Sequence, residues 1–341
     1  MKTICICGGG SLGHVIAGWL SSRECAIVNV LTSHPDDWSH SISVVIPEGR
    51  TLIGIVNKIS SSPSEVIPDS DIVLLAVPGF LISGELIKIK PYLKSDTYVG
   101  SVFSSTSFFF EARKILYQQQ PLWGFQRVPF ICRVAVYGHL ANLLGYKPSY
   151  HIAVENVTHE DKMSFVELIS EWFDRPVFLL KNYLEASLTN SNPLLHTSRL
   201  YSMFAEENEG KVFSRRILFY EEWTEKASDL LIEMDREFFT LLKTLPVSEG
   251  YLPTILEYYE CDDVRTLTEK LASIKGFKGI MSPMVQTKDG FWVPDFSSRY
   301  FTEDFSFGLK YIHDLAVEKG ILIPTIDKVY KWGISKVSAC H

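Results

Sequence analysis

Hydrophobic positions in the first half of the chain fall into short, almost uninterrupted apolar runs. Polar turns and stretches of helical period, such as residues 165–173, separate these runs. Uninterrupted runs of this length are typical of strands that are buried on both faces of a parallel sheet. The pattern predicts an α/β fold with a doubly wound sheet, whose strands are expected at residues 3–7, 26–32, 71–80, 97–103, 151–156 and 176–180.

Beyond residue 180 the spacing of apolar residues changes to that of helices. In residues 216–245, apolar residues recur at i, i+3 and i+4 with acidic residues between them, and Pro246 ends the pattern. The sequence therefore predicts an all-α C-terminal domain with one long helix at residues 216–245 and further helices at residues 264–274, 305–320 and 324–337.

This change of period places a domain boundary at residue 180. We predict an N-terminal nucleotide-binding domain at residues 1–180 and a helical substrate domain at residues 181–341. The polar residues around Ser60 are expected to form a loop and not a linker between domains. Because no disordered connection separates the domains, a cleft between them is the expected place for ligands.

A glycine-rich turn, CGGGSLG, joins the first predicted strand to the first predicted helix. Gly8, Gly10 and Gly13 have the spacing G-x-G-x-x-G. The first glycine permits a tight turn, the second lets backbone approach a pyrophosphate, and the third lets helix and strand pack closely. Ser11 and Leu12 open the helix, where free N–H groups attract phosphates. A Rossmann-type domain that binds a dinucleotide is therefore predicted.

The end of the second predicted strand bears on which dinucleotide binds. An acidic residue there would accept hydrogen bonds from the ribose 2′-hydroxyl of NAD. This chain instead has Thr32, Ser33 and His34, which could donate to a 2′-phosphate, although no arginine is present and Asp36 and Asp37 follow closely. The sequence favours NADP(H) and leaves NAD(H) open.

The run at residues 71–80 ends in Val77, Pro78 and Gly79. In a doubly wound sheet, the loop after such a strand lies beside the ligand crevice. Val77 and Pro78 are therefore candidates to contact the cofactor. A simple turn that ends the strand is the alternative interpretation.

Composition narrows the classes of partner. The 341 residues are 46% hydrophobic and 21% charged, with a net charge of -7, which gives no reason to expect nucleic acid or an anionic membrane. No apolar run reaches the length of about 18 residues that a membrane span requires. The six scattered cysteines and the absence of signal-peptide features favour a cytoplasmic protein with reduced thiols and no metal site. Small molecules are the expected partners, and the oligomeric state is left open, a homodimer included.

Two segments of the C-terminal half could carry chemistry. In NSNPLLH, the pair Asn192-Pro193 predicts the start of a helix, with asparagine as its cap, and His196 follows on the same face as Asn192. Taken alone, this histidine could be a packed core residue.

The second segment is SSRYFTEDF, which holds Arg299, Glu303 and Asp304. Asp304 and Arg299 could also have purely structural roles. Asp304 could cap the helix that follows it, and Arg299 could form a surface ion pair with Glu303. Local pattern does not decide between these uses and a catalytic one.

Five stretches taken together resemble the octopine/nopaline (opine) dehydrogenase family. The resemblance covers nearly the whole chain, and its C-terminal motifs are more specific than the glycines. The stretches are GGGSLG, GFQRVPFICRVAVYG, TNSNPLLHTSRLY, FYEEWTEKASDLLIEMDREF and SSRYFTEDFSFGL with IPTIDKVYKW. At residues 100–109, GSVFSSTSFF departs from the proline and glycines that relatives often carry near the nicotinamide.

The resemblance implies a reductive condensation, in which a 2-oxo acid and the amino group of an amino acid form an imine that NAD(P)H reduces. It implies that His196 and Asp304 are an acid/base pair, that Arg299 binds the oxo acid and that Asn192 lies near the reacting centre. Arg133 also matches a family arginine, and we expect it to form a structural salt bridge. These residue types suit the roles, because histidine titrates near neutrality, a carboxylate fixes its tautomer and a guanidinium grips a carboxylate through two hydrogen bonds.

Two other functions are compatible with a glycine-rich domain followed by a helical one. A ketopantoate or 3-hydroxyacid reductase would typically carry a lysine four residues before its key asparagine. Here Ala186 and Leu188 occupy those positions before Asn190 and Asn192, so the acid that this reaction needs is missing. A non-catalytic NAD(P)-binding protein is also compatible with the fold, but it would not need His196, Arg299 and Asp304 together.

Overall fold

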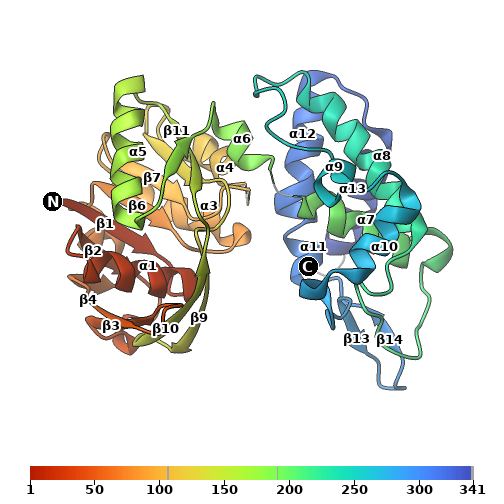
Figure 1. Cartoon of the computed structure of the whole chain (residues 1–341), viewed down its shortest axis with the longest axis horizontal. Coiled ribbons are helices and arrows are strands. Elements are labelled where there is room, and N and C mark those ends of the chain that lie inside the picture. Colours follow the sequence, from red (N-terminus) through yellow and green to blue (C-terminus); the bar gives the residue numbers. More distant parts are fainter. Residues whose placement is uncertain (106, 190, 339–341) are drawn as a thin grey trace. The chain divides into compact units, whose positions relative to one another are not determined.

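The structure is a computed structural model, and it describes residues 1–105, 107–189 and 191–338. The chain divides into two compact units, an N-terminal unit at Met1–Thr189 and a C-terminal unit at Asn190–His341 (Figure 1). The sequence pattern changes nine residues earlier, at residue 180, where the last predicted strand ends.

An eight-stranded sheet forms the centre of the N-terminal unit. The middle strands are parallel, and their order reverses at β1, as in a doubly wound sheet. The predicted α/β fold is therefore confirmed. In spatial order the strands are β12 (Val177–Leu179), β11 (Tyr150–Glu155), β8 (Leu122–Phe125), β7 (Tyr98–Ser101), β6 (Ile72–Leu75), β1 (Lys2–Cys7), β2 (Ala26–Leu31) and β5 (Lys58–Ser60).

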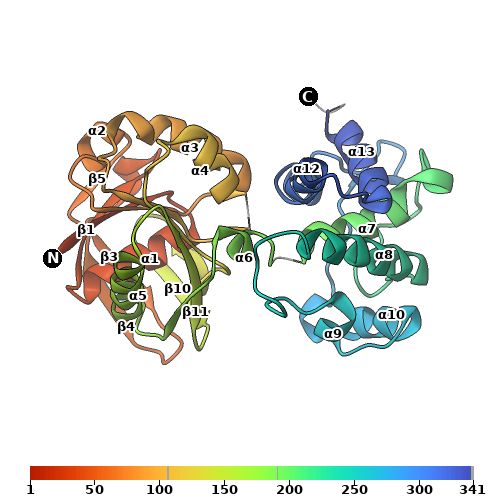
Figure 2. The ribbon, with the colours of Figure 1, turned by 90° about the horizontal axis from the view of Figure 1, so that it is seen from above.

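Alternate residues of the strands pack against helices on opposite faces of this sheet. On β1, Ile4 and Ile6 join one apolar core, whereas Cys5 and Cys7 join another. Figure 2 shows α2, α3 and α4 over one face and α1 and α5 over the other. The helices of this unit are α1 (Ser11–Ser22), α2 (Pro63–Val66), α3 (Gly79–Ile89), α4 (Phe108–Ile115), α5 (His159–Phe173) and α6 (Tyr183–Ser187), with 3-10 turns at Pro35–Asp37 and Lys90–Tyr92.

A second sheet packs on α1 and was not predicted. Its strands, in spatial order, are β4 (Thr51–Ile55), β3 (Ser41–Val45), β10 (Leu140–Tyr146) and β9 (Phe130–Val136). Gly18 and Gly54 allow the close contact with the helix, since a Cβ on Gly54 would lie 2.5 Å from the Gly18 carbonyl oxygen. The predicted loop around Ser60 is also partly wrong, because β5 ends at Ser60 and α2 begins three residues later.

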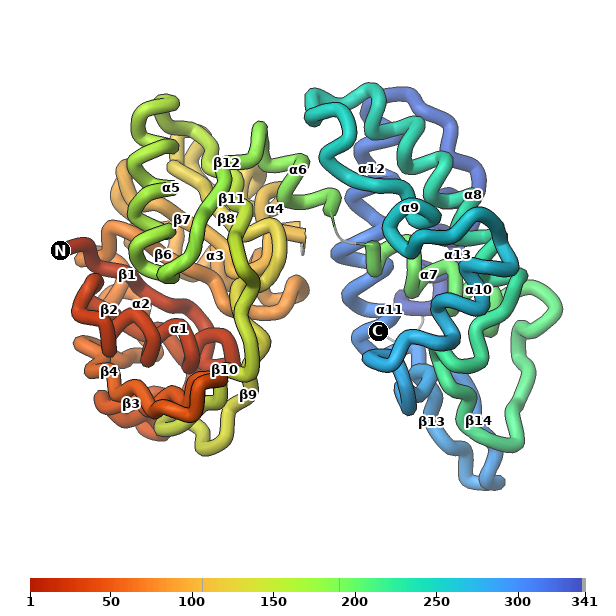
Figure 3. Tube along the Cα trace, viewed as in Figure 1, coloured from red at the N-terminus to blue at the C-terminus, as the bar shows by residue number. Residues whose placement is uncertain are grey.

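The C-terminal unit is mainly helical, and Figure 3 traces its path. Its helices are α7 (Asn192–Phe204), α8 (Glu225–Leu242), α9 (Ile255–Tyr259), α10 (Val264–Ser273), α11 (Arg299–Thr302), a π-helix (Phe305–Leu309), α12 (Lys310–Lys319) and α13 (Pro324–Ser338), with 3-10 turns at Glu206–Asn208 and Lys275–Phe277. The predicted helical C-terminal domain is therefore confirmed, and it also contains a two-stranded hairpin, β13 (Met284–Gln286) and β14 (Trp292–Pro294), that was not predicted.

The long helix predicted at residues 216–245 is shorter than expected. It begins at Glu225, because the Thr224 side chain caps it by accepting a hydrogen bond from the Ala227 N–H group. Residues 209–224 form no helix, and Arg216, Phe219 and Tyr220 lie in this irregular segment. Within the described residues, no helix is both long enough and apolar enough to cross a membrane.

Candidate active site

The glycine-rich turn has the close contacts that its spacing predicts. Gly8 has φ = +123°, a conformation that favours glycine. A Cβ on Gly13 would lie 2.0 Å from the Gly8 carbonyl oxygen, so only glycine lets α1 pack this closely against the turn. A Cβ on Gly10, in contrast, would meet no atom within 4 Å. The second glycine therefore faces open space at the start of the helix.

A cavity of about 220 Å³ lies at this turn. The predicted cofactor residues that line it are Gly8, Gly10, Thr32, Ser33, Val77 and Pro78. The other three do not line it: Ser11 accepts a hydrogen bond from the Val134 N–H group at 3.1 Å, Gly13 packs beneath the turn, and Leu12 packs against the core. The N–H groups at the start of α1, the open side of Gly10 and the cavity together fit a dinucleotide.

Sequence reasoning missed two charged residues of the same cavity. Glu85 and Lys88 on α3 line it together with Leu81, and the spacing i, i+4 and i+7 places all three on one helix face. The Thr32 side chain is buried, and its hydroxyl lies 3.4 Å from the Tyr137 hydroxyl, whereas Ser33 and His34 are exposed. Ser33 and Lys88 are thus exposed donors that line the cavity, and His34 is an exposed neighbour of Ser33.

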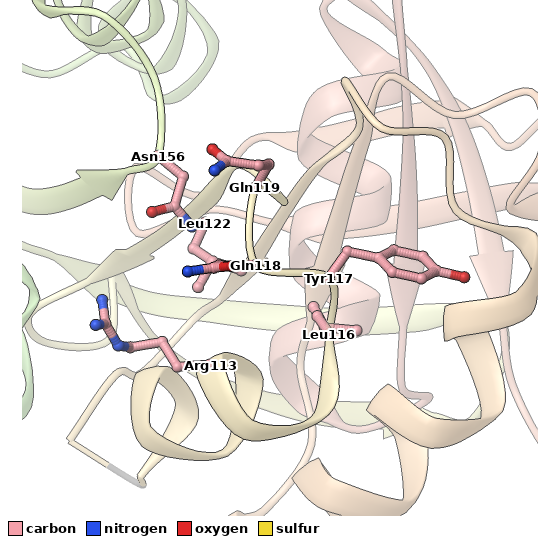
Figure 4. A pocket seen from close by; sticks show the side chains of 7 residues that line it. All are labelled: Arg113, Leu116, Tyr117, Gln118, Gln119, Leu122 and Asn156. Carbon is pink, nitrogen blue, oxygen red and sulfur yellow. The ribbon is translucent and has the colours of Figure 1, made fainter.

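A larger cavity, of about 510 Å³, lies elsewhere in the N-terminal unit (Figure 4). Arg113, Gln118 and Asn156 line it with polar groups. Leu122, which also lines it, pairs with Val99 near the start of β7, whereas the glycine turn follows the end of β1. The larger cavity thus lies at the N-terminal ends of the parallel strands, and the smaller one lies at their C-terminal ends. None of the predicted site residues lines the larger cavity.

In the C-terminal unit, His196 and Asp304 are in direct contact. His196 Nδ1 lies 2.8 Å from Asp304 Oδ2, and only 12% and 16% of the two side chains are exposed. Because a carboxylate accepts hydrogen bonds, Nδ1 carries a hydrogen atom and donates a hydrogen bond to Asp304. The local alternative for Asp304 is wrong, since its side chain does not cap the helix that follows.

Close packing between α7 and the π-helix brings this pair together. A Cβ on Gly308 would lie 2.8 Å from Pro193 Cγ, so the glycine lets the π-helix approach the start of α7. On the other side, a Cβ on Gly333 of α13 would lie 2.1 Å from the Phe305 ring. The segment that carries Asp304 is therefore packed between two helices, and π-helical turns are frequent at functional sites.

Asn192 and Arg299 lie at the starts of two helices. Asn192 is the first residue of α7 and not its cap, because the Ser191 carbonyl accepts from the Leu194 and Leu195 N–H groups. Arg299 is exposed, and within the described part of the chain its guanidinium has no hydrogen-bond or ion-pair partner. The predicted alternative, an ion pair with Glu303, is not formed.

Tyr220 is a contact of His196 that sequence reasoning missed. Its hydroxyl lies 2.8 Å from His196 Nε2, the ring nitrogen that faces away from Asp304. Burial, with smaller effects from nearby Tyr300 and other groups, raises the pKa of the Tyr220 phenol far above its usual range, so it is neutral. Its ring lies between those of Phe277 and Trp223, with centroids 4.1 Å and 5.9 Å away.

Arg133 and the stretch at residues 100–109 are the two remaining features that the family resemblance singled out. Arg133 is exposed on β9, donates to the Cys132 carbonyl at 3.1 Å and has no acidic partner among the described residues, so the expected salt bridge is not formed. In the departing stretch at residues 100–109, Ser107 is the cap residue just before α4 and has φ = +70°, and Thr106 lies outside the described residues.

Comparison with known proteins gives one family model and several relatives. Residues 179–336 match the model described as NAD/NADP octopine/nopaline dehydrogenase, alpha-helical domain. The chain is 28% identical to tauropine dehydrogenase of Arabella iricolor, over 97% of this chain and 90% of the relative. It is 26% identical to octopine dehydrogenase of Mizuhopecten yessoensis, over 99% of this chain and 90% of the relative.

Solved structures share the fold along the whole chain. Octopine dehydrogenase with NADH and L-arginine has a TM-score of 0.85 and 24% identity, over 99% of this chain and 90% of the other. A ketopantoate reductase of the PanE/ApbA family from Ralstonia eutropha JMP134 has a TM-score of 0.64 and 15% identity, over 99% of both chains. The reductase fold is thus related but more distant.

Proposed function

We propose that the chain is an enzyme of the octopine/nopaline dehydrogenase type, which catalyses the NAD(P)H-dependent condensation of a 2-oxo acid with the amino group of an amino acid; the match of residues 179–336 to that family's helical domain and the relatives at 26–28% identity support this. The relatives are named for tauropine and octopine, and solved octopine dehydrogenase structures contain NADH with L-arginine, agmatine or pyruvate. We assign dinucleotide binding to residues 1–180 and substrate binding to residues 181–341. The hydrogen bond between His196 and Asp304 carries the proposal.

The acid/base work falls to His196. When the amino nitrogen adds to the keto carbon, the keto oxygen must take up protons before it can leave as water and give the imine. An imidazolium donates such a proton, and Asp304 at 2.8 Å stabilises that charge and fixes the ring orientation. The bound NAD(P)H supplies the hydride that reduces the imine. Asn192, one helical turn before His196, is proposed to contact the reacting centre.

Arg299 is proposed to bind the carboxylate of the oxo acid. Its guanidinium is exposed and without a protein partner in the described residues, and it lies five residues before Asp304. A guanidinium holds a carboxylate through two parallel hydrogen bonds, which would orient the keto carbon.

Replacing Arg299 by methionine should raise the KM for the oxo acid roughly 10- to 100-fold, because hydrogen bonds to a charged group are lost. The affinity for NAD(P)H should not change. Steady-state kinetics with varied oxo acid measure this effect. Arg265→Met is the control, since Arg265 is another exposed arginine of the C-terminal unit, on α10, where it pairs with Glu269. An unchanged KM for the Arg299 variant would exclude the assigned role.

We propose that NADPH binds more tightly than NADH. Ser33, His34 and Lys88 offer donors to a 2′-phosphate, and residues 30–34 contain no carboxylate to hold a 2′-hydroxyl. Fluorescence titration with each reduced cofactor tests this preference. Lys88→Met should weaken NADPH binding and leave NADH binding unchanged, and tighter binding of NADH by the unmodified protein would contradict the proposal.

Consumption of NAD(P)H in the presence of pyruvate and pooled amino acids tests the reaction itself. We expect the absorbance at 340 nm to fall only when both substrates are present. A fall with the oxo acid alone would indicate a reductase of the ketopantoate type. No fall with any pool of oxo acids and amino acids would leave a protein that binds the dinucleotide without this chemistry.

A further inference from the structure

We propose that Tyr220 is a positioning residue that holds Nε2 of His196 and favours the neutral imidazole. The inference rests on the proposed function, because it concerns the proton that His196 donates. With Nδ1 bound to Asp304, Nε2 is the nitrogen left to exchange a proton with a substrate. The Tyr220 hydroxyl lies 2.8 Å from it, so the hydroxyl must move aside or pass the proton on.

Hydrogen bonds from Arg199 hold the backbone on both sides of Tyr220, and Arg199 lies on the same helix as His196. Arg199 lies one turn after His196 on α7 and is only 2% exposed. Its Nε donates to the Phe219 carbonyl at 3.0 Å, and its Nη2 donates to the Glu222 carbonyl at 2.6 Å. These two carbonyls flank Tyr220. The buried guanidinium therefore anchors the segment of Tyr220 to the helix of His196.

The hydrogen bonds that the Tyr220 hydroxyl can form show which charge state of His196 it favours. When Nε2 is neutral it accepts, and the Tyr220 hydroxyl donates to it. When Nε2 is protonated the hydroxyl must accept, and its own proton then has no other protein acceptor among the described residues. Tyr220 is only 4% exposed, so an unused donor there is costly. Tyr220 thus opposes Asp304, which favours the charged ring.

Two further phenols of the described chain lie near the pair, and phenols keep their proton near neutral pH. Tyr300 lies against the imidazole, with ring centroids 4.8 Å apart. Tyr259 of α9 lies close enough to Tyr220 to raise its pKa further. Burial, and then Asp304, also raises the pKa of the Tyr300 phenol. Among the described residues, Asp304 and Tyr220 are therefore the two groups that hold hydrogen bonds to the His196 ring.

The test is the pH profile of Tyr220→Phe, which keeps the stacked ring and removes the hydroxyl. In the condensation direction, activity falls at high pH as His196 loses its proton. We expect this fall in kcat/KM to occur roughly half to one pH unit higher in the variant, the size of one hydrogen bond. Tyr300→Phe is the matched control, because its phenol touches the ring without a hydrogen bond to it, and its profile should not move.

An unchanged profile for Tyr220→Phe, or equal shifts in both variants, would overturn the proposal. NMR titration of the His196 ring in the unmodified protein and in Tyr220→Phe provides a readout without turnover, and the same upward displacement is expected. If no condensation activity is found, the proposed function fails while the NMR comparison still decides the role of Tyr220. Arg199→Lys keeps the charge but lacks the forked guanidinium whose Nε and Nη2 reach the two carbonyls. It should show part of the displacement and serves if Tyr220→Phe does not fold.

Discussion

Replacing His196 by alanine should lower kcat for the condensation by about 10²- to 10⁴-fold, the usual contribution of a general acid. The variant removes the proton donor and leaves Asp304 without its partner at 2.8 Å. The cavity proposed to bind the cofactor is lined only by residues of the N-terminal unit, so the Kd for NAD(P)H should stay within twofold. Initial rates at saturating substrates and fluorescence titration measure the two quantities separately.

His313→Ala is the matched control for this experiment. His313 is also a half-buried histidine of the C-terminal unit between carboxylates, 3.2 Å from Asp314 and 3.3 Å from Asp327. It lies on α12 and is not in contact with His196. Its loss should leave kcat near that of the unmodified protein, with melting curves to verify folding. Near-normal kcat for the His196 variant, or equal losses in both variants, would exclude His196 as the acid.

The parts of the fold that were predictable depend on local pattern. Apolar runs identify strands buried on both faces, and Gly8, Gly10 and Gly13 fix a strand–turn–helix unit within a dozen residues. The second sheet has no comparable signal. Its strands β3 and β10 are parallel neighbours about 100 residues apart in the chain, with Leu140 opposite Ser43. Pairing over that distance depends on packing against α1, which no window of sequence contains.

The candidate site also combines residues that could be predicted from the sequence with one that could not. His196 and Asp304 are 108 residues apart, so only the family resemblance could pair them in advance. Tyr220 was missed because apolar and acidic residues continue the helical period of α8 back to residue 216. The one local signal against a helix there is Thr224, a good N-cap residue that is followed by Glu225. A helix that starts at this cap leaves residues 216–223 outside it, where Tyr220 can reach His196.

Alanine at Gly13 and alanine at Gly10 should both weaken cofactor binding, but only alanine at Gly13 should lower stability. At Gly13 the new Cβ would lie 2.0 Å from a backbone oxygen, so the helix or the turn must shift. We expect a loss of about 1–3 kcal/mol of unfolding free energy, the usual cost of overpacking, together with a loss of cofactor binding. Urea denaturation and fluorescence titration measure both.

At Gly10 the same methyl group meets no atom within 4 Å, and φ is an ordinary -81°. Gly10→Ala should therefore keep its unfolding free energy within about 0.5 kcal/mol. Its affinity for NAD(P)H should nevertheless fall about tenfold or more, because the methyl group occupies the side of the turn that a pyrophosphate must approach. Normal cofactor affinity in Gly10→Ala would mean that this side of the turn is not the phosphate site. A loss of affinity without a loss of stability cannot come from damage to the fold, so it would locate the pyrophosphate at this glycine.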